Sequence, residues 1–149
     1  MTKQCYFMDT SALFKRYVEE SGSNVVNRLL GKEDACYISI LTLCEVISNL
    51  KRLVEIDGLL SDDEFKMVKS IFLNDIGNGY LQTLDVGPQV ILSSLEICST
   101  RYITPLDAIQ LATVLSMNEA NPVFVCSDVK VNRIAEDLGL EVLNPGQID

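Results

Sequence analysis

The chain has 149 residues, and its 12 basic and 21 acidic side chains give a formal charge of −9. It contains no histidine, which excludes Ser-His-Asp and Cys-His catalysis, a histidine general base and Cys2His2 zinc sites. Its length and its apolar share of 48% are typical of one globular domain, so we expect a single domain over 1–149. The longest uncharged stretch, 108–118, is much shorter than the about 20 residues of a membrane span. We therefore expect a cytoplasmic protein that does not enter a membrane.

The first half of the chain alternates between strand and helix patterns. A buried strand at 5–8 precedes a helix to about residue 20, which Thr10 or Ser11 can cap, and a helix at 24–30. A second strand is expected at 36–39 and a long helix at 42–56. Ser61 and Glu64 form a capping box, which predicts a helix from there to about residue 76.

The second half continues the same alternation. A third strand at 80–86 precedes a helix from Pro88 to about residue 100, and Thr104-Pro105 begins another at 106–117. A strand at 123–126, a helix at 129–138 and a short strand at 140–143 complete the chain. This alternation predicts an α/β fold with a mostly parallel sheet that is covered by helices on both faces.

The five cysteines are odd in number and contain no CxxC pair, which is typical of thiols that pack in a core rather than of a disulfide or metal site. Cys5, Cys36, Cys98 and Cys126 lie in apolar runs, where a small buried thiol fits. Cys44, next to an acid on a predicted helix, is left open.

Four acids stand apart from the solvated majority. Asp9 and Asp128 each follow a predicted buried strand, Asp107 is at the start of an apolar helix, and Glu45 lies within the apolar run 38–47. Ligands of parallel α/β sheets gather at the carboxyl ends of the strands, where Asp9 and Asp128 would both stand. These acids are therefore the candidate site residues.

Each acid also has a purely structural interpretation. Asp9 and Asp128 could cap the helices that follow them, and Asp107 in a first helical turn complements the helix dipole. Taken one at a time, the cap is the more frequent role. Glu45 is harder to explain in this way, although it could form a buried ion pair with Arg52, two helical turns further on.

Four neighbouring carboxylates would repel one another and raise their pKa values, and a divalent metal ion removes that cost. Mg²⁺ and Mn²⁺ prefer oxygen ligands, and such sites hydrolyse phosphodiesters without any histidine. A metal site made only of oxygen ligands therefore suits this composition.

The segments that carry these acids, in this order, resemble the PIN-domain ribonucleases, and among them the small VapC-type toxins of toxin–antitoxin pairs. The segments are MDTSALFKRY at 8–17, SILTLCEV at 39–46, PLDAIQLAT at 105–113 and SD at 127–128, with the tail AEDLGLEV at 135–142. Together they span essentially the whole chain.

This resemblance implies a three-layer α/β/α sandwich and an endoribonuclease that depends on Mg²⁺ or Mn²⁺ and selects single strands. By the same resemblance, Asp9 and Asp107 would be the core metal ligands, and Glu45 and Asp128 would complete the shell directly or through water. Ser11, with Thr10 beside it, would support the site. Members of this family usually form homodimers, and the toxins bind a small antitoxin protein that blocks the site.

Three features depart from the family pattern. Some members carry a further acid shortly after the fourth, where this chain has Lys130 and Asn132. We expect the segment 57–79, with its extra helix, to be longer than in the smallest toxins, and its role is open. The negative charge disfavours general RNA binding, which depends on neutralising phosphates. Local basic groups would then bind the substrate. The candidates are Lys15, Arg16, Arg52 and Lys130, with Lys51 and Arg101 as further ones.

Two other functions compete with a nuclease. The first is a catalytically weak PIN-like module that binds proteins. The second is phosphoryl transfer through an aspartate, as in receiver domains, which is less favoured because the segment 9–11 lacks a second aspartate.

Overall fold

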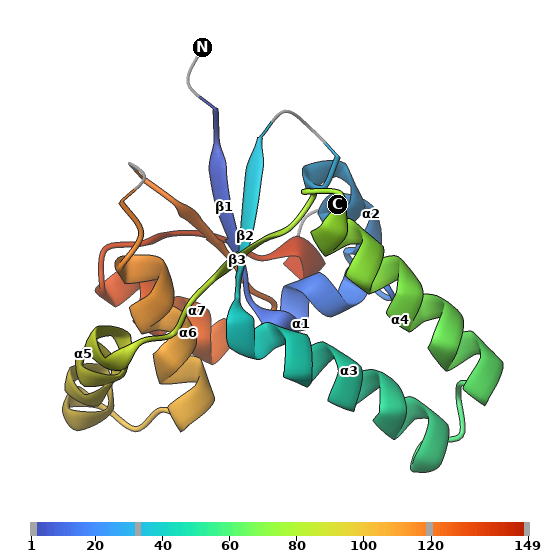
Figure 1. The fold of residues 1–149 in the computed structure, drawn as a ribbon. Helices are drawn as coiled ribbons and strands as arrows, with labels where there is room; N and C mark the ends of the chain where they lie inside the picture. Colours follow the sequence, from blue (N-terminus) through green and yellow to red (C-terminus); the bar gives the residue numbers. More distant parts are fainter. Residues whose placement is uncertain (1–2, 32–33, 119–120, 148–149) are drawn as a thin grey trace.

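The computed structural model describes residues 3–31, 34–118 and 121–147. Five parallel strands form one sheet in the order β3–β2–β1–β4–β5 (Figure 1). The strands are β1 (Cys5–Met8), β2 (Ala35–Ser39), β3 (Gln82–Leu84), β4 (Val123–Val125) and β5 (Glu141–Leu143). The helices are α1 (Thr10–Leu13), α2 (Ser23–Leu29), α3 (Ile40–Glu55), α4 (Asp62–Gly77), α5 (Pro88–Thr100), α6 (Pro105–Leu115) and α7 (Val129–Asp137), with the 3₁₀ turns η1 (Phe14–Arg16) and η2 (Pro145–Gln147).

The sheet separates two hydrophobic cores, which makes the fold a three-layer α/β/α sandwich. Met8 and Ile38 face a core built with α1 to α4, in which Phe72 of α4 is fully buried. Phe7 and Phe124 face the other core, built with α5 to α7. Because both faces are covered, the central strands are apolar throughout, as in CYFM and VFV.

The strand register brings the ends of two central strands to one point. Met8 of β1 pairs with Val125 of β4, so Asp9 and Cys126 follow their strands side by side. The amide of Asp9 donates to the carbonyl of Val125 at 2.9 Å, which continues the ladder by one residue. In Figure 1 this carboxyl edge of the sheet is the lower one, from which α1 and α3 start.

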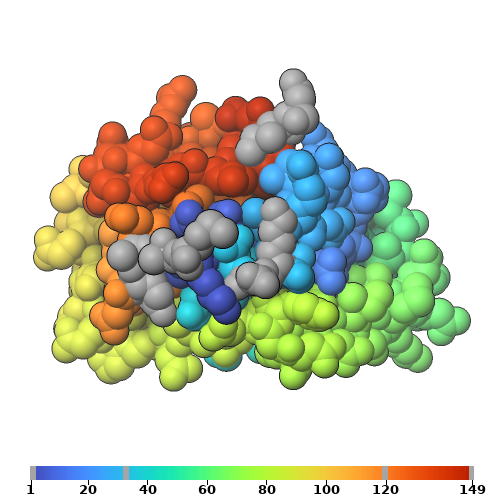
Figure 2. Space-filling view, turned by 90° about the horizontal axis from the view of Figure 1, so that it is seen from above, coloured from blue at the N-terminus to red at the C-terminus, as the bar shows by residue number. Residues whose placement is uncertain are grey.

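The opposite edge of the sheet is viewed in Figure 2, which looks at the molecule from above. The dark-blue start of the chain lies near the middle of that face, between the red and orange C-terminal segments and the blue and green helices. The site acids therefore lie on the side of the molecule that Figure 1 shows at the bottom. None of the described helices is long and apolar enough to cross a membrane.

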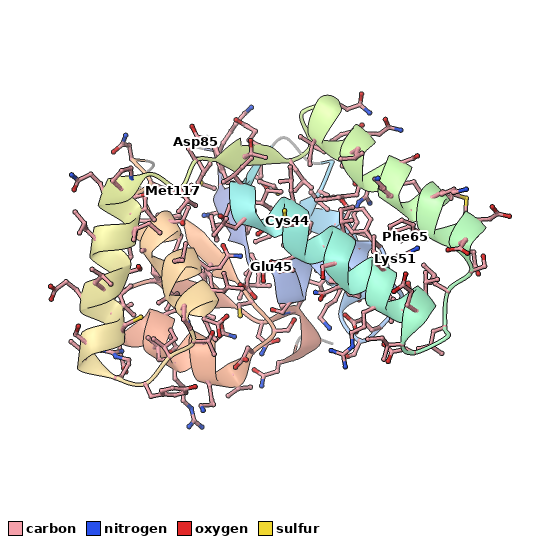
Figure 3. The ribbon with its side chains drawn as sticks, turned by 60° about the horizontal axis from the view of Figure 1, so that its bottom comes forward. Cys44, Glu45, Lys51, Phe65, Asp85 and Met117 are labelled. Carbon is pink, nitrogen blue, oxygen red and sulfur yellow. The ribbon has the colours of Figure 1, made fainter. Side chains whose placement is uncertain are left out.

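Helices α3 and α4 form an antiparallel arm on one side of the sheet (Figures 1 and 3). The Ser61–Glu64 capping box begins α4 as expected. The Nζ atom of Lys51 on α3 lies 4.9 Å from the ring centre of Phe65 on α4, a cation–π contact between the two helices.

Several sequence expectations need correction. The first helix is α1 followed by η1 and ends at Arg16, not near residue 20, and its N-cap is Asp9 rather than Thr10 or Ser11. Strand β3 is only Gln82–Leu84, because its neighbour β2 ends at Ser39, the partner of Leu84, and continues as α3. Cys98 is exposed on α5 instead of buried, and Cys44 is also exposed.

Candidate active site

Asp9 lies at the centre of the carboxyl edge. Its Oδ2 atom accepts hydrogen bonds from the Ser11 amide at 3.2 Å and the Ser11 hydroxyl at 2.7 Å, and the Cys126 thiol lies 3.6 Å away. The Ser11 hydroxyl in turn accepts from the amide of Ser127 at 3.2 Å, which ties this turn to the end of β4. Only 6% of Asp9 is exposed, so a buried carboxylate is held in a fixed orientation.

Glu45 reaches the same region from α3. Its Oε1 atom accepts a hydrogen bond from the Thr10 hydroxyl at 3.0 Å. Figure 3, in which the bottom of Figure 1 comes forward, shows Glu45 near the middle of this face. Asp85, an acid that follows β3, lies well apart from it. The alternative partner, Arg52, is 3.9 Å from Asp57 instead.

A buried amide supports this arrangement from α6. The Nε2 atom of Gln110 lies 3.0 Å from the Thr42 hydroxyl and 3.4 Å from the Thr10 hydroxyl, and it donates to both. Gln110, Thr42 and Thr10 are all buried. The chain of contacts from Gln110 through Thr10 to Glu45 therefore links α6, α1 and α3 behind the carboxylates.

Asp107 and Asp128 stand at the first turns of α6 and α7. The Thr104 hydroxyl donates to Oδ2 of Asp107 at 2.8 Å. Asp128 caps α7, since its Oδ1 accepts from the amides of Lys130 at 2.9 Å and Val131 at 3.2 Å. Both acids line one hollow of about 120 Å³.

The capping roles considered for these acids are real, and they do not exclude a second role. Asp9 and Asp128 both serve as N-caps in the structure. Each cap uses one named oxygen, Oδ2 of Asp9 and Oδ1 of Asp128. The cap fixes the carboxylate, and within the part of the chain that the structure describes its second oxygen accepts no hydrogen bond.

The negative charge of Asp107 acts on both Asp9 and Glu45. Burial raises the pKa of Asp9 and the negative charge of Asp107 raises it further, although hydrogen bonds from Ser11 oppose the rise. Burial also raises the pKa of Glu45, with Asp9 and Asp107 adding to the effect. Asp128 lies beside Asp107, since both acids line the same hollow.

The donor set fits a hard divalent cation. Among the residues that the structure describes, none of these four acids pairs with a lysine or arginine. Within the same part of the chain, no three carboxylates or thiols are arranged to hold a metal ion by themselves. Mg²⁺ commonly binds through one or two carboxylates and keeps several waters, so a close cage is not required. Carboxylate and hydroxyl oxygens are the atoms that such an ion selects.

The four cations proposed for substrate binding lie in different surroundings. Lys15 is buried, with Nζ 3.5 Å from Glu20. Arg16 donates from Nε and Nη2 to the buried Asp75 at 3.1 and 3.2 Å and from Nη1 to Asn27 at 3.1 Å. Arg52 is exposed. Lys130 is the one among them that lines the hollow beside Asp107 and Asp128.

Three residues of this region were not expected from the sequence: Gln110, Thr42 and Cys126. Gln110 and Thr42 each interrupt an apolar helix three residues from a site acid, and this spacing places them on the acid's side of the helix. The position of Cys126 required the strand register, because the contact with Asp9 depends on β1 and β4 ending together.

The three-layer fold and the acids at its carboxyl edge define a class, an α/β/α protein with an acidic site. The family model of the PIN domain matches residues 6–137. The chain therefore belongs to the PIN-domain family. A comparison with curated proteins finds no match.

Solved structures share the fold. FitAcB from Neisseria gonorrhoeae is 18% identical with a TM-score of 0.71, and the match covers 96% of this chain and 99% of that one. A toxin–antitoxin complex from Klebsiella pneumoniae is 16% identical with a TM-score of 0.66, over 96% and 99%. DNA-bound VapBC from Salmonella typhimurium is 15% identical with a TM-score of 0.65, over 95% and 98%. At these identities the comparison establishes the fold.

Proposed function

We propose that this protein is a metal-dependent endoribonuclease that hydrolyses RNA phosphodiesters and is the toxin of a toxin–antitoxin pair. The observation that carries the proposal is the gathering of Asp9, Glu45 and Asp107 at the carboxyl edge of a PIN-domain sheet, where the charge of Asp107 raises the pKa of both Asp9 and Glu45. Carboxylates held together without a basic partner store repulsion that a divalent cation would remove. Such an arrangement is disfavoured unless a ligand compensates it.

The residues divide into ligands and supports. Asp9 and Asp107 would hold Mg²⁺ or Mn²⁺, with Glu45 and Asp128 completing the shell directly or through water. Ser11 keeps Asp9 in place with two hydrogen bonds, and Thr10 keeps Glu45 in place with one. When bound, the cation would supply an activated water and neutralise charge on the phosphate, and histidine would not be needed.

Substrate binding falls mainly to Lys130 in this proposal. Its position beside the hollow allows the ammonium group to contact a phosphate next to the site. Arg52, Lys15 and Arg16 remain candidates for contacts with more distant phosphates. The cut would leave a 5′-phosphate and a 3′-hydroxyl, the products of direct attack by water.

Cleavage of total cellular RNA by the purified protein with Mg²⁺ or Mn²⁺ tests the proposal. We expect discrete products that are absent with EDTA and absent for Asp9→Asn. Asp85→Asn is the matched control, because Asp85 also follows a strand but is exposed and lies away from Glu45. Cleavage by Asp9→Asn at the level of the Asp85→Asn protein would contradict the assignment.

The partners proposed are a small antitoxin and a second copy of the chain. Two solved structures of the same fold are described as VapBC or a toxin–antitoxin complex. Exposed apolar side chains on α4 and α5 support protein contacts. These side chains are Met67, Ile71 and Leu73 on α4 and Ile91, Leu92 and Leu95 on α5.

Growth on induction separates a toxin from a housekeeping nuclease. We expect expression of the chain to stop growth, and co-expression of the neighbouring gene to restore it. Asp9→Asn should be harmless. If the protein neither cuts RNA nor binds Mn²⁺, the protein-binding module becomes the better description.

A further inference from the structure

The hollow beside Asp107 and Asp128 is also lined by aliphatic side chains that take no part in the proposed metal site. Among them, Ile103 and Val131 are buried and Ile134 is partly buried. Tyr102, on the connection between α5 and α6, lies at the hollow and is 85% exposed. A large aromatic ring is thus held next to the acids and left open to solvent.

The size of this hollow suits one aromatic ring. Its volume of about 120 Å³ is of the same order as the about 150 Å³ apolar cavity that accommodates benzene in an engineered protein core. The rest of the lining is polar and consists of Thr104, Asp107, Asp128 and Lys130. A planar ligand in the hollow would therefore have both apolar side chains and hydrogen-bonding groups within reach.

The chemistry of this lining selects a nucleobase. Unpaired bases of RNA stack on exposed aromatic side chains, and their edges donate and accept hydrogen bonds. Carboxylates accept from the amino and imino groups of a base, and the ammonium of Lys130 suits the phosphate attached to it. Because Asp107 belongs both to the hollow and to the proposed ligand set, a base held there would lie next to the phosphodiester to be cut.

We propose that Tyr102 and the hollow formed by Ile103, Asp107, Asp128, Lys130 and Ile134 bind one unpaired nucleobase of the RNA substrate, adjacent to the cleaved bond. This inference rests on the proposed ribonuclease function. It assigns to Tyr102 the stacking contact and to the hollow the discrimination between single-stranded and paired RNA, because a base in a duplex cannot enter it.

Binding of an unstructured, fluorescein-labelled RNA oligonucleotide of mixed sequence, followed by anisotropy, tests the proposal. All proteins carry Asp9→Asn so that the RNA stays intact. We expect Tyr102→Leu to raise Kd about tenfold, the low end of what loss of one base–aromatic stack produces. Tyr102→Phe should restore binding to within about twofold, since the ring is kept. Tyr80→Leu is the control, because Tyr80 is another exposed tyrosine and lies outside the hollow.

An abasic RNA series distinguishes stacking from a structural effect. Removing the base at one position should weaken binding to the Tyr102 protein as much as Tyr102→Leu does, and the two losses should not add.

Equal Kd values for Tyr102→Leu and Tyr80→Leu, while the parent protein binds RNA, would overturn the inference and leave the proposed nuclease function intact. A change in oligomeric state of Tyr102→Leu by light scattering would also overturn it, because Tyr102 would then be an interface residue. Failure of the chain with Asp9 restored to cut or bind any RNA would instead remove the proposed function and this inference together.

Discussion

The Asp9 carboxylate has both a structural and an electrostatic role. It accepts two hydrogen bonds from Ser11, one of which caps α1, and it is buried within reach of the charge of Asp107. Hydrogen bonds hold its orientation, whereas burial and repulsion oppose its ionisation. The negative charge that is proposed to bind the metal therefore lowers the stability of the metal-free protein.

Asp9→Asn is expected to stabilise the metal-free protein at neutral pH. The pKa of Asp9 is raised in the folded state above its ordinary value of 3.8, so the folded protein binds more protons than the unfolded chain as the pH rises past that value. The contribution of this group to stability is thus complete below pH 3.8 and is lost as the pH rises through the raised pKa. Asparagine keeps the cap and removes the charge.

Thermal unfolding in EDTA measures this effect. We expect the Tm of Asp9→Asn to exceed that of the parent by about 2–4 °C at pH 7, the shift that about 1 kcal/mol produces in a chain of this size. The difference should shrink towards pH 4. A lower Tm for Asp9→Asn at pH 7 would show that the carboxylate is stabilised where it lies.

Gln110 gives a second prediction at the scale of one residue. Gln110→Leu leaves the buried Thr42 hydroxyl without its amide donor and frees Thr10 from α6. We expect the free energy of unfolding in urea to fall by about 0.5–1.5 kcal/mol, the net contribution of a hydrogen bond, because the Thr42 hydroxyl still accepts from the Thr10 hydroxyl at 3.3 Å. Gln89→Leu, at an exposed position of α5, should change it by less than about 0.5 kcal/mol. Equal values for the two variants would remove Gln110 from the support of the site.

At the scale of elements, the positions of strands and helices followed from local patterns. The apolar runs, the Ser61–Glu64 capping box and the prolines at 88 and 105 begin or bound elements where expected. The first helix was overestimated because its continuation depends on tertiary contacts: η1 turns so that Arg16 and Tyr17 reach Asp75 on α4. Contacts of this kind, between residues 58 or 59 positions apart, leave no local pattern.

The candidate site was also predictable only where the signal is local in the sequence. The four acids were identifiable because each stands at a strand end or within an apolar helix. The contacts behind them were not, because the Gln110–Thr42 bond joins two helices across 68 residues and the Asp9–Cys126 contact depends on register. Cys98 was assigned to the core from its apolar neighbours, but one face of α5 is exposed and carries it.

The contacts of Asp75 with Arg16 and Tyr17 join two elements, and we expect a large loss of stability when Asp75 is replaced. Asp75 is 5% exposed and accepts from Arg16 and from the Tyr17 hydroxyl at 2.7 Å, so it fastens η1 to α4. Asp75→Ala is expected to lower the free energy of unfolding by about 2–3 kcal/mol. This is below the about 3–5 kcal/mol typical of a fully buried pair, since Arg16 is partly solvated.

Asp62→Ala provides the comparison in the same chemical denaturation experiment. Asp62 pairs with Lys51 at 3.3 Å, but its side chain is 75% exposed, and surface pairs contribute about 0–1 kcal/mol. A loss for Asp75→Ala no larger than that for Asp62→Ala would contradict the anchoring role.

At the scale of the whole molecule, a protein with a charge of −9 is proposed to bind a polyanion. The two facts are compatible if negative charge gathers where a cation neutralises it and basic groups face the substrate locally. Lys130 beside the hollow is such a basic group. Neutralisation of the negative charge depends on the bound metal.

The distribution of thiols tests the global fold independently of the site. Cys44 and Cys98 are exposed, whereas Cys5, Cys36 and Cys126 are buried, and burial raises the pKa of Cys36 to about 12. We expect the exposed pair to react rapidly with a disulfide reagent at pH 8 in the native protein, and the buried three to react only on unfolding. Rapid reaction of all five thiols would contradict the two-core packing.

Titration of the metal-free protein with Mn²⁺ in a calorimeter is the decisive measurement for the proposed metal site, because it reports the carboxylates without any RNA. We predict saturable binding to the parent and unchanged binding for Asp85→Asn. For Asp9→Asn and for Asp107→Asn we predict an affinity at least about tenfold weaker, as in loss of a metal-site residue. Equal affinity in all four proteins, or no binding to the parent, would contradict the proposed metal site.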